Sequence, residues 1–251
     1  MNMPRKVLQA ATFPVCLLSL LEWYARGADS QALAPPSLAA QAFVAACADG
    51  SLWQATLFTL VSAALGLLPG AGLGVLLGIA LGLSPRASAI SFLSVEVLRP
   101  VPSVALIPLA LLVFGFGLRM EVAVVGFATF WPMLLLAQAA ARQVDPRLLE
   151  VAMALGLSPR DRICKIMIPA MVPRLFVALR LGVAVALVVA VTVEIAANPH
   201  GMGYAIMIAQ QSLDPALMLA WLLWIAVVGF AVNHLAQRTQ TWVARRMGGL
   251  S

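Results

Sequence analysis

Glu96 and Arg99 place an acidic and a basic side chain three residues apart inside an otherwise apolar stretch. This spacing puts both on one face of a helix, where they can form an ion pair. Pro100 and Pro102 follow and interrupt the helical hydrogen bonds, which frees nearby carbonyl groups to line a cavity. An ionisable residue inside a membrane span is a candidate for a transport pathway. Two interpretations stay open. Glu96 and Arg99 either neutralise each other as a structural ion pair, or Arg99 provides a positive electrostatic potential for an anion that crosses the membrane.

The side chains that carry most enzyme chemistry are scarce and isolated in this sequence. His200 and His234 have no cysteine or acidic partner at ligand spacing, so no metal site is expected. The three cysteines lack metal or redox spacing and are expected to be small apolar fillers: Cys16, Cys47 and Cys164. No serine lies in a nucleophile elbow and no glycine-lysine phosphate loop is present. We therefore expect a chain that is not an enzyme, binds no cofactor and cannot hydrolyse ATP by itself.

The composition is that of a membrane protein. Of the 251 residues, 62% are hydrophobic and 10% are charged, and the mean hydropathy is +0.97, far outside the usual soluble range. A helix needs about 20 apolar residues to cross the hydrocarbon. One all-α transmembrane domain over residues 1–251 is predicted, with six spans near 7–25, 53–82, 89–114, 121–141, 173–196 and 216–237. The third span holds charges and prolines, so we expect it to be buried in protein or to line a pathway.

The positive charges predict that both termini lie in the cytoplasm. With that orientation most arginines and both lysines fall on the inner side, while the outer side keeps Arg26 and Arg119 beside acidic residues such as Glu121. This asymmetry explains the basic pI without a nucleic-acid partner. The apolar run after Arg5-Lys6 has no small-residue cleavage site, so it is expected to remain as the first span.

A run of glycines lies inside the second predicted span. Its members are Gly70, Gly72, Gly74, Gly78 and Gly82, and they include three overlapping small-xxx-small pairs. Such pairs permit close approach of a neighbouring helix. The run lacks the strand context and final spacing of a nucleotide-binding fingerprint. We therefore expect a packing role.

Residues 142–172 form a polar, proline-rich interruption between apolar stretches. Asp145 is an expected helix cap, and Gly156 an expected left-handed stop. Ser158 then opens a second short helix, with Asp161 three residues later as a partial capping box. The pattern predicts a helix, a glycine elbow and another short helix outside the bilayer, with the return to the membrane marked by Pro169 and Pro173.

This interruption resembles the EAA loop of bacterial ABC importer permeases, with the pattern E-A-A, three residues, Gly, nine residues, Ile, one residue, Leu-Pro. The matching positions are Glu150, Ala152, Gly156, Ile166, Ile168 and Pro169, with Val151 replacing the first Ala and Ile168 replacing the Leu. The resemblance implies that the loop, including Leu157, Ser158 and Arg160, inserts into a groove on a separate ATP-hydrolysing subunit. The plain alternative is an ordinary amphipathic cytoplasmic loop.

Other segments resemble the nitrate, sulfonate and taurine subfamily of these permeases. Residues 99–109 (RPVPSVALIPL) and 114–117 (FGFG) are similar to its third-span signature, which places Ser103 with Arg99 in the implied pathway. Gly201-Met202-Gly203-Tyr204 is similar to its Gly-Leu-Gly-Tyr segment, and Glu194 matches an acidic position seven residues before it. We expect these residues at an outer gate. Glu194 either binds a receptor, braces the loop to Tyr204, or has a structural role.

The resemblance implies the type I ABC importer permease fold, with six membrane helices and cytoplasmic coupling helices. It implies a second permease copy, most often identical, and two ATPase subunits that carry the ATP and Mg. It also implies a soluble binding protein outside the bacterial inner membrane, and a small anionic solute such as a sulfonate, taurine or nitrate. The lipid bilayer is the remaining partner.

Two other classes remain as alternatives. A self-sufficient secondary transporter or channel often carries inverted repeats with interrupted helices, yet no second copy of the interrupted third span is found and 251 residues is short for two complete repeats. An intramembrane enzyme needs paired catalytic groups at one depth, and neither histidine has such a partner.

Overall fold

The computed structural model describes Cys16, residues 19–27 and residues 34–246, and in this part of the chain all regular secondary structure is helical. Four helices form the centre: α3 (Ser51–Leu83), α6 (Leu118–Arg142), α9 (Ile168–Ala196) and α11 (Pro215–Arg246). Each belongs to a helical stretch long and apolar enough to cross a membrane. Most of the first predicted span, 7–25, lies outside the described residues.

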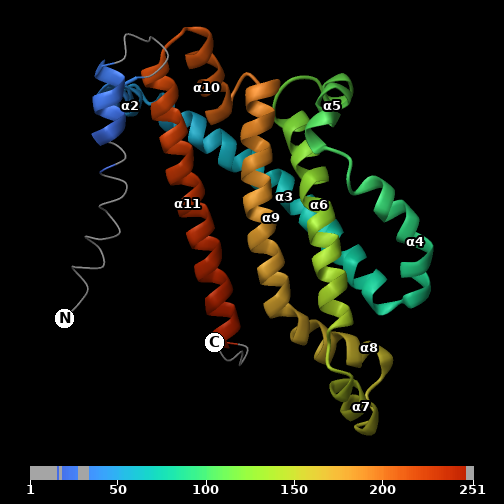
Figure 1. Ribbon diagram of the computed structural model, residues 1–251. Helices are drawn as coiled ribbons and strands as arrows, with labels where there is room; N and C mark the ends of the chain where they lie inside the picture. Colours follow the sequence, from blue (N-terminus) through green and yellow to red (C-terminus); the bar gives the residue numbers. More distant parts are fainter. Residues whose placement is uncertain (1–15, 17–18, 28–33, 247–251) are drawn as a thin grey trace, which may run out of the picture.

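The two ends of the bundle differ (Figure 1). At one end α7 (Pro146–Ala154) and α8 (Pro159–Asp161) project below α6 and α9, and α11 also finishes there. We call this the loop end. At the opposite end lie α2 (Pro36–Ala48), α5 (Ile107–Phe114) and α10 (Gly201–Gln211).

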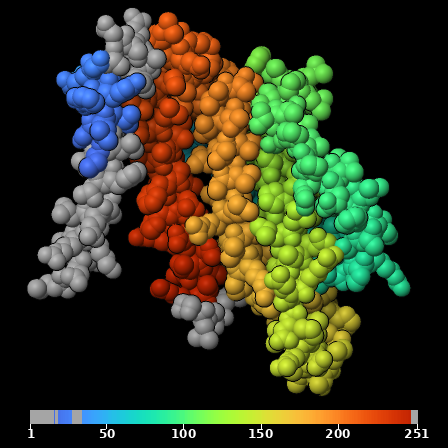
Figure 2. Space-filling view, viewed as in Figure 1, coloured from blue at the N-terminus to red at the C-terminus, as the bar shows by residue number. Residues whose placement is uncertain are grey.

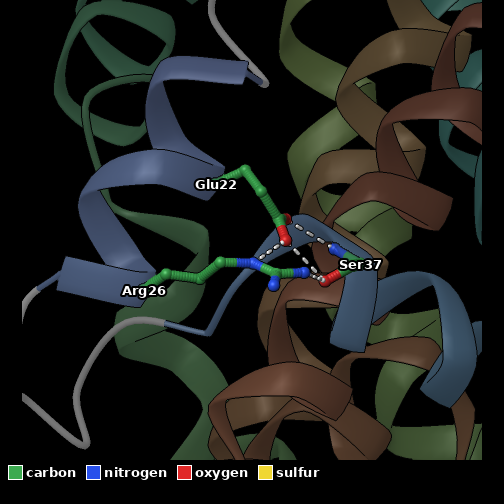
Figure 3. A network of polar contacts seen from close by, with 3 residues as sticks. All are labelled: Glu22, Arg26 and Ser37. Carbon is green, nitrogen blue, oxygen red and sulfur yellow. Dashed lines mark hydrogen bonds and ion pairs between the residues drawn. The ribbon is translucent and has the colours of Figure 1, made fainter.

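A polar contact ties the helical residues 19–27 to the start of α2 (Figure 3). Glu22 accepts hydrogen bonds from the backbone N–H of Ser37, at 3.0 Å, and from its hydroxyl, at 2.7 Å. Arg26 donates to Glu22 one turn earlier, at 2.6 Å. One carboxylate thus joins two helices near the opposite end.

The glycine run packs α3 against α6. A Cβ on Gly74 would lie 2.6 Å from the carbonyl oxygen of Phe130, and one on Gly82 would lie 2.5 Å from the Cβ of Ala141. Gly66, Gly70 and Gly78 make equally close approaches, whereas Gly72 faces open space. The predicted packing role is confirmed for Gly70, Gly74, Gly78 and Gly82, which recur at every fourth residue and form a glycine stripe on one face of α3.

The third predicted span is two helices rather than one. α4 (Pro85–Leu98) and the segment formed by a 3-10 turn, η1 (Ser103–Leu106), with α5 meet at 79°. Pro100 and Pro102 lie in the break, where each removes a backbone donor. α4 has no buried residue within this chain, so the described residues do not bury the first half of this span. That it lines a pathway stays a prediction. If the bent pair counts as one span, the described residues hold five.

The chain re-enters the bundle through a widened turn. Residues Arg162–Met167 form a π-helical segment, η2, that runs directly into α9. Pro169 lies in the first turn of α9 and Pro173 inside it. A π turn accommodates the missing N–H and the ring of a following proline. The second helix of the loop is therefore continuous with α9, and both prolines lie in the first turns of that helix, where the chain returns to the bundle.

Candidate functional site

The loop end carries the predicted helix, elbow and second helix start. The Asp145 carboxylate accepts from the backbone N–H of Arg147 at 2.9 Å and caps α7. Gly156 has φ +68°, the left-handed stop expected there. The Ser158 hydroxyl accepts from the N–H of Asp161 at 3.2 Å. Local capping chemistry thus builds the elbow as predicted.

Side-chain contacts make this elbow rigid. Arg162 Nε donates to the carbonyl oxygen of Leu157 at 2.8 Å, across the turn between α7 and α8. Lys165 pairs with Asp161 at 2.7 Å. The hydrogen bond from Lys165, with that from Ser158, lowers the pKa of Asp161, and the same pair raises the pKa of Lys165.

The motif residues of the loop divide by burial. Ala152 is fully buried. A small apolar cluster that includes Val144, Met167 and Met171 packs the base of the loop against α6 and α9. Glu150 and Arg160 are exposed, while Leu157, Ile166 and Pro169 are half-buried. The outward surface keeps apolar side chains: Leu155 is 70% exposed, and Val151 and Met153 are exposed beside it. An exposed apolar surface beside polar residues suits a protein partner.

A second candidate region is a cavity of about 340 Å³ beside the α4 break. Arg99 and Ser103 line it from the break, Phe127 and Trp131 from α6, and Val185 from α9. Arg99 lies 3.6 Å from Glu96, and both side chains are about half exposed. The structure therefore brings Arg99 and Ser103 to one cavity. Glu96 is not in the lining and is linked to the cavity through its ion pair with Arg99. Pro100 and Pro102 belong to the backbone break.

The buried indole of Trp131 adds an unsatisfied donor to the wall of this cavity. Its Nε1–H finds no acceptor among the described residues, although buried donors are usually paired. Two phenylalanines hold the ring edge-on, Phe127 and Phe130, with centroids at 5.7 and 4.8 Å. The cavity wall is thus aromatic on one side and polar at the break.

The third region, at the opposite end, is a buried polar cluster. Glu121 on α6 and Glu194 on α9 are both fully buried, and their carboxyl groups are neighbours. Ser62 of α3 and Asn198 donate to Glu121. Glu194 accepts from the backbone N–H of Gly203 at 2.8 Å. The cluster therefore joins α3, α6, α9 and α10.

This cluster bears on two expectations. Glu121, expected on the outer side of the membrane, lies at the end of the bundle opposite the loop, and its side chain is buried inside the protein. Glu194 accepts from the backbone of α10, and the described chain shows no hydrogen bond between it and the half-buried Tyr204. Gly201, with φ +91°, packs directly against the Glu194 carboxyl. The geometry favours the bracing role of Glu194, made through Gly201 and Gly203.

No group of three or more histidine, cysteine, aspartate or glutamate side chains within the described ranges could hold a metal ion. His200 stacks on Phe58 and His234 on Phe230 instead.

Comparison with known proteins identifies the class. Residues 70–249 match the family described as binding-protein-dependent transport system inner membrane component. The putative aliphatic sulfonates permease SsuC of Bacillus subtilis is 32% identical over 71% of this chain and 62% of its own length. The taurine permease TauC of Escherichia coli is 29% identical over 77% and 72%. The nitrate permease NrtB of Synechococcus elongatus is 30% identical over 80% and 69%.

A relative with a different named solute covers more of the chain. The riboflavin permease RibX of Chloroflexus aurantiacus is 36% identical over 90% of this chain and 87% of its own. Among solved structures, an inward-facing form of the MetNI methionine ABC transporter superposes with a TM-score of 0.61, at 19% identity, over 77% of this chain and 94% of that chain. That likeness shows the type I importer permease fold. The chain therefore belongs to the binding-protein-dependent ABC importer permeases, the membrane subunits of these transporters.

Proposed function

We propose that two copies of this chain form a homodimeric pathway, with two ATPase subunits docked at the loop end and a binding protein at the opposite end. The loop end is then cytoplasmic, as are both termini. Leu155, Val151 and Met153 offer the ATPase an apolar surface on α7 and its elbow. ATP and Mg are bound by the partner subunits, and this chain supplies no cofactor site.

The coupling step follows from the rigidity of the elbow. Closure of the ATPase pair draws the two α7–α8 elbows together, and the Arg162–Leu157 bond keeps each elbow in one shape. Because η2 continues into α9 and α7 follows α6 closely, movement of the elbow is passed to both helices. Rigid-body rotation of this kind opens a pathway on one side and closes it on the other.

We infer that the solute is a small anion. The observation that carries this is the Arg99 and Ser103 cavity at the break of α4. Guanidinium groups bind carboxylate, sulfonate or nitrate oxygens with strong charge-assisted hydrogen bonds. The relatives are named for sulfonates, taurine, nitrate and riboflavin. The argument for an anion therefore rests on Arg99 and its neighbours.

The test is reconstitution of the tagged chain with the ATPase and binding protein that co-purify with it. Uptake of labelled taurine, an alkanesulfonate and nitrate is measured in liposomes with ATP, without ATP, and without the ATPase. Uptake of one of these anions that requires both ATP and the ATPase is the expected result. Uptake by the chain alone would identify a secondary carrier and overturn the proposal.

A further inference from the structure

At the loop end, three hydrogen-bonding side chains meet between α4 and α6. The hydroxyl of Ser88 accepts from Gln138 Nε2 at 3.0 Å and from Arg142 Nη2 at 2.5 Å. A hydroxyl that accepts two bonds still has its own O–H to donate. The Arg142 guanidinium has five N–H groups and uses one of them here. The three side chains therefore present several free donors at one point.

No carboxylate in the described part of the chain forms an ion pair with the positive charge at this point. The ion pairs in the described part of the chain join Arg26, Arg99 and Lys165 to carboxylates, and Arg142 is in none of them. The nearest acidic residue in sequence, Asp145, caps α7 instead. Arg142 is thus a cation with donors around it and no paired carboxylate among residues 16, 19–27 and 34–246.

A cavity of about 600 Å³ opens beside these donors. Its described lining is Gly82, Pro85, Ser88, Ala89, Phe92 and Arg142, which includes no acidic side chain. One water occupies about 30 Å³ in the liquid, so the volume far exceeds what a small inorganic ion fills. The lining is polar near Arg142 and apolar at Phe92, which suits a ligand with a charged head and an apolar body.

The surface beyond the cavity is apolar as well. α4 stands beside α6 at the edge of the molecule (Figure 2), and it buries none of its residues. Ile90 is 83% exposed and Leu93 is 71% exposed, next to Phe92. Apolar side chains that face outward from a membrane helix meet lipid chains. The cavity therefore lies where a headgroup and its acyl chains can be held together.

We propose that Arg142, Ser88 and Gln138 form a binding site for the phosphate of an anionic phospholipid, whose acyl chains lie along the exposed face of α4. Basic pockets between membrane helices on the cytoplasmic side suit such headgroups. With the loop end on the cytoplasmic side, as in the proposed function, the lipid belongs to the inner leaflet.

The site lies at the base of the coupling loop. Arg142 is the last residue of α6, and the carbonyl of the next residue, Gln143, accepts from Arg174 of α9 at 3.0 Å. A bound headgroup therefore braces the point where α6 passes into the loop. We expect anionic lipid to stabilise this end of the permease and to support coupling.

The experiment uses the purified full chain in nanodiscs of phosphatidylcholine alone and of an equal mixture with phosphatidylglycerol. Arg142→Gln is compared with Arg238→Gln, which removes the same charge from an exposed residue of α11 away from the cavity. Thermal unfolding and the lipids retained in native mass spectrometry are the readouts. Ser88→Ala is the second variant, in case Arg142→Gln does not fold.

Phosphatidylglycerol is expected to raise the melting temperature of the wild type and of Arg238→Gln. Arg142→Gln loses this rise and binds the lipid about fivefold more weakly, the equivalent of one basic contact. If phosphatidylglycerol raises the melting temperature of Arg142→Gln and Ser88→Ala as much as that of the wild type, or does not raise that of the wild type, the proposed site is wrong. The same stabilisation by inorganic sulfate in phosphatidylcholine alone would identify a free-anion site instead. None of these outcomes depends on an ATPase subunit or a transported solute.

Discussion

Glu194 of α9 accepts a 2.8 Å hydrogen bond from the backbone N–H of Gly203 on α10, and both residues are buried. The same carboxyl group faces Glu121 of α6, so one side chain connects three helices at the opposite end of the bundle. A buried backbone donor costs free energy when it loses its acceptor. The position of α10 therefore depends on an acceptor at residue 194.

Replacement of Glu194 by alanine is expected to lower the free energy of unfolding by about 1–3 kcal/mol, because the Gly203 N–H loses its acceptor. Glu194→Gln is the matched control, since its carbonyl oxygen still accepts from Gly203. The measurement is denaturant unfolding in detergent. Equal stability of the two variants would contradict the bracing role.

The glycine stripe predicts opposite effects at two neighbouring positions of α3. Gly74→Ala puts a methyl group 2.6 Å from the Phe130 carbonyl oxygen and 2.9 Å from the Met133 Cβ. Overpacking of this kind costs about 1–3 kcal/mol. Gly72→Ala meets no atom within 4 Å and is expected to stabilise the helix by about 0.5–1 kcal/mol. Thermal unfolding of the two variants side by side checks this, and a loss at both would refute the packing role.

Gly156→Val is expected to weaken ATPase docking. The φ of +68° strains a β-branched residue, at a cost of about 1–2 kcal/mol. No atom lies within 4 Å of the position where a Cβ would be added, so the effect is conformational rather than steric against a neighbour. Gly156→Asn is the control, because asparagine tolerates this conformation. The readout is the amount of ATPase subunit that co-purifies with a monodisperse permease; full recovery with Val would show that the elbow is not the docking element.

Arg99→Ala is expected to reduce anion uptake about tenfold or more, the value of one or two charge-assisted hydrogen bonds. ATPase co-purification stays unchanged, because Arg99 is remote from α7. Glu96→Gln is the companion variant: it removes the carboxylate 3.6 Å from Arg99 and is expected to retain uptake. If Arg99→Ala transports normally, the pair is structural.

The elbow is expected to be sensitive to acid. Hydrogen bonds from Lys165 and Ser158 lower the pKa of Asp161. A group whose pKa is lower in the folded state contributes stability above its unfolded pKa, about 3.9, and loses it as the pH falls through the folded value. The protection of the amides of residues 158–165, measured as exchange relative to the intrinsic rate at each pH, is therefore expected to fall below about pH 4. Asp161→Asn should show protection that does not change over this range, and a wild type equally insensitive would exclude the effect.

The structural features that depend only on residues close together in the sequence were predictable from it. Asp145, Gly156 and Ser158 each act within one turn of the chain, so their types and spacing were sufficient to predict the caps and the elbow. The apolar stretches likewise predicted the long helices, because a span is defined by its own composition. The resemblance to importer permeases rested on these same local motifs.

Contacts between distant helices were decided only by the tertiary structure. Asn198 reaches Glu121 across 77 residues of chain, and Arg142 reaches Ser88 across 54. The spacing puts Gly74 but not Gly72 in the small-xxx-small pairs, yet only the structure shows that the partner facing Gly74 is α6. Charge placement along the chain assigned Glu121 to the outer side of the membrane, but only the packing of α3, α6 and α9 shows that its side chain is buried inside the bundle. The physical reason is that a helix has a fixed set of side-chain directions, but which direction meets another helix depends on how the helices pack.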